Sequence, residues 1–198
     1  MLFRSVGGSG GIVDQWDIYR DRGADRVSPS FLPNILVDSA SGQLAINLGI
    51  RGPNFAVVSA CATGSHAIGE AAEAIRRGDV DAVLAGGTEA CIHPIMLAGF
   101  TAMRGLAHED EVPSDASRPF DARRAGFVMA EGSGAVILED WEHAQRRGAT
   151  IYAEVLGYGA SNDAHHMAQP EPEAQGVAAM RSEEHTSELQ SRGLISYA

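Results

Sequence analysis

The feature that most constrains this chain is a predicted passage from a buried strand into a helix around Cys61. Residues 54–58 (NFAVV) are mostly apolar and partly β-branched, which is typical of a core strand. From Ala62 to Arg77 the apolar residues recur at helical spacing and leave one polar face, and Gly78 follows as a helix terminator. We therefore expect a strand over Asn54–Ala60 that leads directly into a helix.

This arrangement places Cys61 in the first turn of the predicted helix. The first N–H groups of a helix have no intrahelical partner, and together with the helix dipole they favour negative charge. Cysteines at such positions are more easily deprotonated, and the thiolate is the nucleophile. Cys61 is therefore a candidate nucleophile. The alternative is that it is a small buried hydrophobic residue, as most free cysteines are.

Composition restricts the classes of function. The chain of 198 residues is long enough for one domain or part of a larger one, and no run of 18 apolar residues predicts a membrane span. Two cysteines make no disulfide framework, which favours a reducing, cytoplasmic location. A net charge of −11 argues against nucleic acid as a partner. Lysine is absent, so this chain holds no catalytic lysine.

Both ends of the chain differ from its body. Residues 1–5 and 181–198 look like translated sequencing-library adaptors, and regular core patterning stops after Met180. The alternative for the C-terminal part is a natural polar tail. We interpret Val6–Met180 as the biological segment and set the ends aside when deriving the fold. A tail of this origin is expected to make no stable contact with the body.

Between these ends, short apolar strands alternate with helical patterns. This alternation, with each strand a near-continuous apolar run, predicts an α/β sheet covered on both faces. The expected helices are Ile12–Arg22, Phe31–Leu48, Pro94–Met103 and Trp141–Arg147, besides the helix that follows Cys61. The expected strands, besides Asn54–Ala60, are Asp81–Gly87, Ser133–Glu139 and Ile151–Tyr158, with loops over 107–125 and 159–180.

Five short motifs occur in order along this segment: Ser59-Ala60-Cys61-Ala62-Thr63-Gly64, Gly86-Gly87-Thr88-Glu89, Ser117-Arg118-Pro119-Phe120-Asp121, Arg124-Ala125-Gly126-Phe127-Val128 and Ser161-Asn162-Asp163-Ala164-His165-His166-Met167. Together they resemble β-ketoacyl-acyl-carrier-protein synthases, the type II condensing enzymes. The resemblance implies the N-terminal half of a thiolase-like layered α-β-α sandwich with a mixed, mostly parallel sheet. The implied divisions are adaptor-derived residues 1–5, an N-terminal domain lacking its start over 6–156, the beginning of the C-terminal half over 157–180, and the tail 181–198.

The resemblance also implies a reaction. The cysteine matching Cys61 would take an acyl group from acyl carrier protein as a thioester. Malonyl-acyl-carrier-protein would then lose carbon dioxide, and its carbanion would attack that thioester to give a 3-oxoacyl product. The family works as a homodimer, and neither a cofactor nor a metal is expected. Its two catalytic histidines, its lysine and a gating phenylalanine belong to motifs that would follow Met180, so we expect this chain alone to be inactive in condensation.

Further site residues follow from the resemblance alone. Acyl-channel or pantetheine-channel positions match Val6, Phe31 (reaching across the dimer interface), Phe100, Phe127 and His166; carrier-protein contacts match Arg26 and Arg104. From the residues themselves, core packing is the favoured interpretation of the aromatic side chains, and the two arginines are either carrier-protein contacts or ordinary solvated surface. Cys91 matches no catalytic position and is interpreted as structural.

Two other functions remain open at this stage. A polyketide-type ketosynthase would keep Cys61 but accept other chains. A non-catalytic partner subunit of the chain-length-factor type is a scaffold, and such subunits typically lose the cysteine, so Cys61 counts against that reading.

Overall fold

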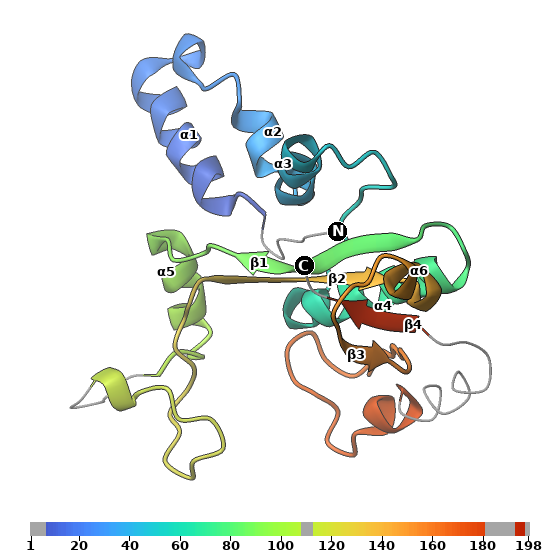
Figure 1. Cartoon of the computed structure of the whole chain (residues 1–198). Helices are drawn as coiled ribbons and strands as arrows, with labels where there is room; N and C mark the ends of the chain where they lie inside the picture. The colour runs from blue at the N-terminus through green and yellow to red at the C-terminus, as the bar shows by residue number, and fades with distance from the viewer. Residues whose placement is uncertain (1–6, 108–112, 181–192, 197–198) are drawn as a thin grey trace.

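The computed structural model describes residues 7–107 and 113–180 and the backbone of 193–196 (Figure 1). Its α-helices are α1 Ser9–Arg22, α2 Phe31–Ile35, α3 Ser39–Leu48, α4 Thr63–Arg76, α5 Pro94–Ala102 and α6 Trp141–Arg146. Short 3₁₀ turns are η1 Ala24–Arg26, η2 Ala60–Ala62 and η3 Pro113–Asp115, and residues 175–180 are also helical. The strands are β1 Ala82–Glu89, β2 Gly132–Glu139, β3 Ile151–Val155 and β4 Gly193–Ser196. No helix in the described ranges is long and apolar enough to cross a membrane.

The four strands form one sheet in the order β1-β2-β4-β3, and each neighbouring pair is antiparallel. The mixture of helices and strands agrees with the predicted α/β class, but the mostly parallel pairing is wrong for the described strands. The reason lies in the connections. After β1 the chain passes through α5 and comes back along β1 as its antiparallel neighbour β2, while β2 and β3, joined through α6, run parallel but are separated by β4.

The core lies between α4 and the β1–β2 pair, and it is built from small side chains. Ala71, Ala72 and Ile75 of α4 pack against Ala85 of β1 and Leu138 of β2. Alanine on the buried face of α4 lets the helix approach the sheet closely, so the C-terminal half of the helix that follows Cys61 is held against the sheet. Figure 1 shows α1, α2 and α3 on the other side of β1, which gives the layered arrangement.

Two predicted elements differ in their boundaries. The helix expected over Phe31–Leu48 is broken between α2 and α3, because Leu36 is extended (ψ 141°) and Asp38 begins a new helix. The small polar residues there favour a helix start over continuation. The strand expected over Ile151–Tyr158 ends at Val155.

The strand predicted over Asn54–Ala60 is wrong. Residues 53–59 form no ladder with any described strand, and Ala60 already belongs to η2. The sequence pattern suits a strand, but a strand also needs a partner that offers free backbone groups along its edge.

The C-terminal tail, by contrast, forms a strand where none was expected. The predicted absence of contact is wrong for Gly193–Ser196, whose backbone pairs with β2 and β3 at once. Leu194 and Ile195 belong to a residue type with high strand propensity, and two free strand edges accept a short segment of this kind whatever its origin. Residues 1–5 lie outside the described residues.

Candidate active site

Cys61 is exposed on a sharp turn that leads into α4. Ala60 has a positive φ of 49°, which alanine rarely adopts and which a surrounding structure must hold in place. Two hydrogen bonds close the turn: the Ser59 N–H donates to Thr63 Oγ1 at 2.9 Å, and the Ala62 N–H donates to the Ser59 carbonyl at 3.1 Å. The turn therefore presents the Cys61 thiol to solvent at the start of a helix.

The N-terminus of α4 has no side-chain cap. The Thr63 N–H instead donates to the Ala60 carbonyl within the 3₁₀ turn, and the positive end of the helix dipole lies at this turn, where it favours negative charge. The end of β1 lies beside this point, because a Cβ built on Gly87 would be 3.4 Å from the Cα of Gly64. Glycine at position 87 thus brings the Gly86-Gly87-Thr88-Glu89 motif against the first turn of the helix.

Cys91 has a different environment from Cys61. It is partly buried, and burial is the main cause that raises its pKa, followed by the negative charges of Glu89 and Glu131. A raised pKa leaves little thiolate at neutral pH, so Cys91 is a poor nucleophile. Within the described ranges no group of three His, Cys, Asp or Glu side chains is placed to hold a metal.

Of the predicted channel residues, the structure brings Phe100 and Phe127 together. Their rings meet edge to face, with centroids 5.1 Å apart and an interplanar angle of 87°. Both belong to the parts of an arm, residues 94–107 and 113–131, that extend from one end of the sheet (Figure 1). Phe31 lies elsewhere, at the start of α2, where it lines a hollow of about 600 Å³ between α1 and α3. Val6 lies outside the described residues.

His166 belongs to an exposed loop, residues 161–167, that encloses a hollow of about 560 Å³. Its Nδ1 accepts hydrogen bonds from the N–H groups of Ala168 and Gln169, both at 3.1 Å. Elsewhere in the loop, Ser161 Oγ donates to the Gly176 carbonyl at 2.6 Å. The loop is therefore held by its own backbone, with the other nitrogen of His166 left for a further partner.

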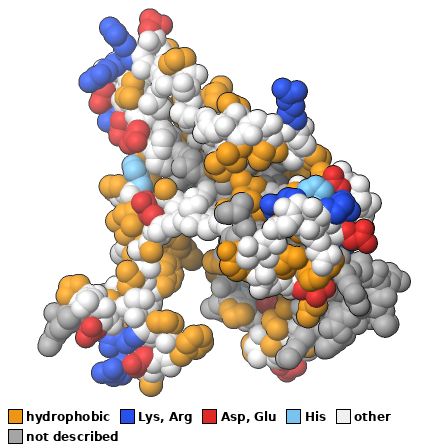
Figure 2. All heavy atoms as spheres, in the orientation of Figure 1, with side chains coloured by type: hydrophobic (Ala, Val, Ile, Leu, Met, Phe, Trp, Pro, Cys, Tyr) orange, Lys and Arg blue, Asp and Glu red, His pale blue; other side chains and the backbone are white. Residues whose placement is uncertain are grey.

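Arg26 and Arg104 are both exposed but come from different elements, η1 and the turn after α5. Arg104 has a positive φ of 54°. Figure 2 shows arginine side chains mixed with acidic ones around the far end of α1, near η1. The two arginines thus do not form one cluster within this chain.

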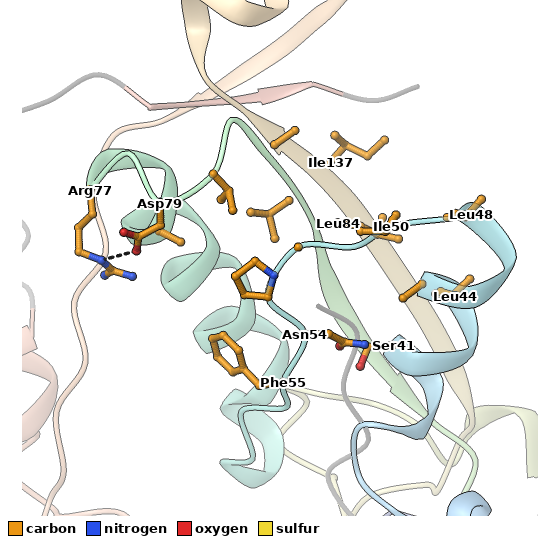
Figure 3. Close-up of a pocket in the computed structure, with 17 residues that line it drawn as sticks. Ser41, Leu44, Leu48, Ile50, Asn54, Phe55, Arg77, Asp79, Leu84 and Ile137 are labelled. Atoms are coloured by element: carbon orange, nitrogen blue, oxygen red, sulfur yellow. Dashed lines mark hydrogen bonds and ion pairs between the residues drawn. The ribbon is translucent and has the colours of Figure 1, made fainter.

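An apolar pocket of about 410 Å³ lies between α3 and β1, apart from Cys61 (Figure 3). Leu44 and Leu48 of α3 face Leu84 of β1 across it, and Arg77 at its edge donates to Asp79 at 2.9 Å. None of the predicted channel residues lines it. It is a place where an apolar helix covers the sheet incompletely.

Sequence reasoning missed Tyr158, which packs on α4 near Cys61. A Cβ built on Gly69, in the middle of α4, would lie 2.1 Å from Cδ2 of the Tyr158 ring. The feature of the sequence that could have revealed this contact is Gly69 itself. Glycine inside a helix costs about 1 kcal/mol relative to alanine, so a glycine in the alanine-rich α4 indicates a close packing partner.

Comparison with known proteins agrees with this geometry. The family model described as "Beta-ketoacyl synthase, N-terminal domain" matches residues 4–144. The chain is 53% identical over 179 residues to "3-oxoacyl-[acyl-carrier-protein] synthase 2" of Rhizobium meliloti (strain 1021), covering 89% of this chain and 42% of that protein. It is 48% identical over 178 residues to the mitochondrial 3-oxoacyl-[acyl-carrier-protein] synthase of Arabidopsis thaliana, covering 87% and 39%.

Solved structures show the same similarity in three dimensions. A ketosynthase complex with its type II polyketide acyl-carrier protein superposes with a TM-score of 0.88 at 31% identity, covering 96% of this chain and 48% of that one. A β-ketoacyl synthase from Burkholderia phymatum STM815 gives a TM-score of 0.85 at 31% identity, covering 95% and 45%. The predicted fold class is confirmed. The chain spans about two fifths of these curated relatives and about half of these solved chains.

Proposed function

Because this chain belongs to the β-ketoacyl synthase family, we propose that the protein it comes from is a 3-oxoacyl-acyl-carrier-protein synthase that elongates fatty acyl chains, with Cys61 as its nucleophile. The observation that carries the proposal is the exposed Cys61 thiol on a strained turn at the uncapped N-terminus of α4. A cysteine kept only for packing would not need such a turn.

The first step is transacylation between two thiols. The Cys61 sulfur attacks the carbonyl carbon of an acyl group carried on the phosphopantetheine of acyl carrier protein. A new carbon–sulfur bond forms to Cys61, the bond to the carrier sulfur breaks, and that sulfur leaves as a thiol after taking a proton. The backbone N–H of Cys61 supplies one donor to the developing oxyanion, and the dipole of α4 favours the negative charge.

The remaining site residues have supporting roles. Phe100 and Phe127, with Phe31 and Val6, contact the acyl chain. His166, held with one ring nitrogen facing away from its backbone partners, contacts the pantetheine. Arg26 and Arg104, both exposed and on separate elements, meet the acidic carrier protein by charge attraction.

In the second step malonyl-acyl-carrier-protein loses carbon dioxide, and its carbanion attacks the thioester on Cys61. We assign the stabilisation of this carbanion to the part of the protein that this chain does not include. Each group that stabilises a developing oxyanion is worth about 10²-fold or more in rate. We therefore propose that the chain as given accepts an acyl group but does not condense it. In this proposal residues 6–156 belong to the N-terminal domain and 157–180 begin the C-terminal half.

We propose that the intact enzyme is a cytoplasmic homodimer. Two features support an assembly. Ile46 and Leu48 of α3 and Phe55 and Val58 of the unpaired segment 53–59 are large apolar side chains left exposed. Apolar side chains also gather at the surface where α3 meets the sheet (Figure 2). The cytoplasmic location rests on two unpaired cysteines, one of them exposed.

A polyketide substrate is the alternative suggested by one solved neighbour. The two curated relatives described above, 53% and 48% identical, are named 3-oxoacyl-[acyl-carrier-protein] synthases, whereas that neighbour is 31% identical, so a fatty acyl chain is favoured.

The test is acyl transfer to the intact 198-residue chain. After incubation with palmitoyl-acyl-carrier-protein, mass spectrometry of peptides should show the acyl mass on Cys61. Cys61→Ala should abolish acylation and Cys91→Ala should leave it unchanged, since the second cysteine serves as the matched control. Acylation of Cys91 instead, or of neither cysteine in folded protein, would contradict the proposal.

A further inference from the structure

The ring of Tyr158 lies against the backbone of α4 at Gly69. A Cβ built on Gly69 would be 2.1 Å from Cδ2, 2.3 Å from Cε2 and 2.4 Å from Cγ of the ring. Real Cβ atoms do not come within 3.0 Å of another heavy atom, so no residue but glycine fits here while the ring stays in place. Gly69 is buried, and the atoms nearest to the position of its missing Cβ all belong to the Tyr158 ring.

Tyr158 also contacts the residues of α4 on either side of Gly69. The His66 ring meets it edge-on, with centroids 6.1 Å apart and an interplanar angle of 77°. Burial, followed by the charge of Glu70 and a hydrogen bond with that carboxylate, raises the pKa of Tyr158. The phenol is therefore neutral near pH 7 and able to donate to Glu70. These contacts all lie in the N-terminal half of α4, between His66 and Glu70.

The segment that leads to Tyr158 is fastened to the other end of the same helix. The Arg76 side chain, 8% exposed, donates to the carbonyls of Val155 at 3.2 Å and Leu156 at 3.1 Å, and it pairs with Glu73. From Arg76 back to Gly69 the helix rises about 10 Å, and three extended residues from Val155 to Tyr158 also span about 10 Å. The segment 155–158 therefore runs along α4 toward the end that carries Cys61.

From this geometry we propose that Tyr158 is a positioning residue for Cys61. Its ring, seated on Gly69, fixes the N-terminal half of α4 and with it the turn that presents the thiol. The inference rests on the proposed function only in treating Cys61 as the nucleophile.

The first experiment measures how fast iodoacetamide labels Cys61 relative to Cys91 in the intact chain at pH 7. Tyr158→Ala should lower this ratio by about threefold, because favourable charge interactions at a helix N-terminus are worth 0.3–1 kcal/mol when the N–H groups stay aligned. Tyr158→Phe keeps the ring and should restore the ratio. Tyr152→Ala removes an exposed tyrosine of β3 and is the matched control. If Tyr158 has only a structural role, Tyr158→Ala should lower the thermal midpoint and leave the labelling ratio unchanged. That result would overturn the proposal.

The second experiment tests the contact itself by a mutant cycle. Gly69→Ala alone should clash with the ring and lower both the labelling ratio and the thermal midpoint. In the Tyr158→Ala background the same change should raise the midpoint, because alanine favours the helix once the ring is gone. Should Tyr158→Ala fail to fold, the double variant still reports the ratio without the ring. A Gly69→Ala protein that behaves as wild type would refute the contact. The labelling ratio reports the surroundings of the Cys61 thiol and does not depend on acyl transfer. If only the acylation test failed, the proposed function would be refuted and the positioning role of Tyr158 would still stand.

Discussion

Glu139, at the end of β2, carries a carboxylate that is almost fully buried and is held by the side chains of Arg147 and His143. Its side chain is 2% exposed. Arg147 donates to both oxygens, from Nε at 2.8 Å and from Nη2 at 2.6 Å, and His143 Nδ1 contacts Oε1. Fork-shaped pairing of this kind is stronger than a single ion pair. The cluster ties α6 to β2, just before the chain enters β3.

Arg147→Ala is expected to destabilise the fold by about 2–3 kcal/mol. Removing one partner of a buried ion pair typically costs about 3–5 kcal/mol, since a charge is left buried. We expect a loss at or below the lower end of this range because the Arg147 side chain is 45% exposed and His143 remains beside Glu139. For a chain of this length the loss corresponds to roughly 6–9 °C in thermal midpoint. Urea unfolding followed by circular dichroism measures the free energy directly.

The control for this variant is its neighbour in sequence. Arg146 is 66% exposed and pairs only with Glu142 at 3.8 Å, also on the surface. An exposed pair of this kind is worth at most about 0.5 kcal/mol, so Arg146→Ala should unfold nearly as wild type does. Equal losses in the two variants would show that the buried carboxylate does not depend on Arg147, and our reasoning about this cluster would fail.

Two further predictions concern single ionisable groups. In brief treatment with iodoacetamide at pH 7, Cys61 should be labelled well before Cys91, because burial and nearby carboxylates raise the pKa of Cys91; equal labelling seen by mass spectrometry would count against Cys61 as nucleophile. Hydrogen bonds from Arg123 lower the pKa of Asp121 from 3.8 to about 2, so its stabilising effect is present above pH 3.8 and is lost as the pH falls toward 2. Arg123→Ala should return the pKa of Asp121 toward 3.8 in an NMR titration, and an unchanged value would refute the pairing.

Local sequence patterns were sufficient to predict those elements that depend on residues close together in the chain. The helix after Cys61 was predictable because its apolar spacing and the terminating Gly78 both act over a few residues, and α4 ends within one residue of the expected position. The same holds for α5, where Pro94 begins the helix and His93 Nδ1 accepts from the Ile95 N–H. The position of Cys61 at a helix start was therefore available from sequence.

Contacts between distant segments were not predictable in this way. Nothing near Tyr158 in sequence shows that its ring will meet Gly69, which lies 89 positions earlier, and the pairing of Phe100 with Phe127 depends on how residues 103–126 fold back. The motif resemblance marked Phe100 and Phe127 individually. Only the structure shows that the Tyr158 ring lies on the backbone of α4 at Gly69 and that the rings of Phe100 and Phe127 meet edge to face.

The two errors in the strand assignments have one physical cause. Residues 54–58 have better strand residues than most of the chain yet form no ladder, whereas Gly193–Ser196, set aside because of its unusual sequence, pairs on both edges. Propensity describes how well a residue tolerates a pleated backbone, but the free energy of a strand comes from hydrogen bonds and side-chain contacts with a neighbour. The edges of β2 and β3 face each other across one strand position, so any short segment able to reach that position gains two ladders. Segment 53–59 pairs with no strand among the described residues, and its exposed Phe55 and Val58 are the side chains that a neighbouring strand would cover.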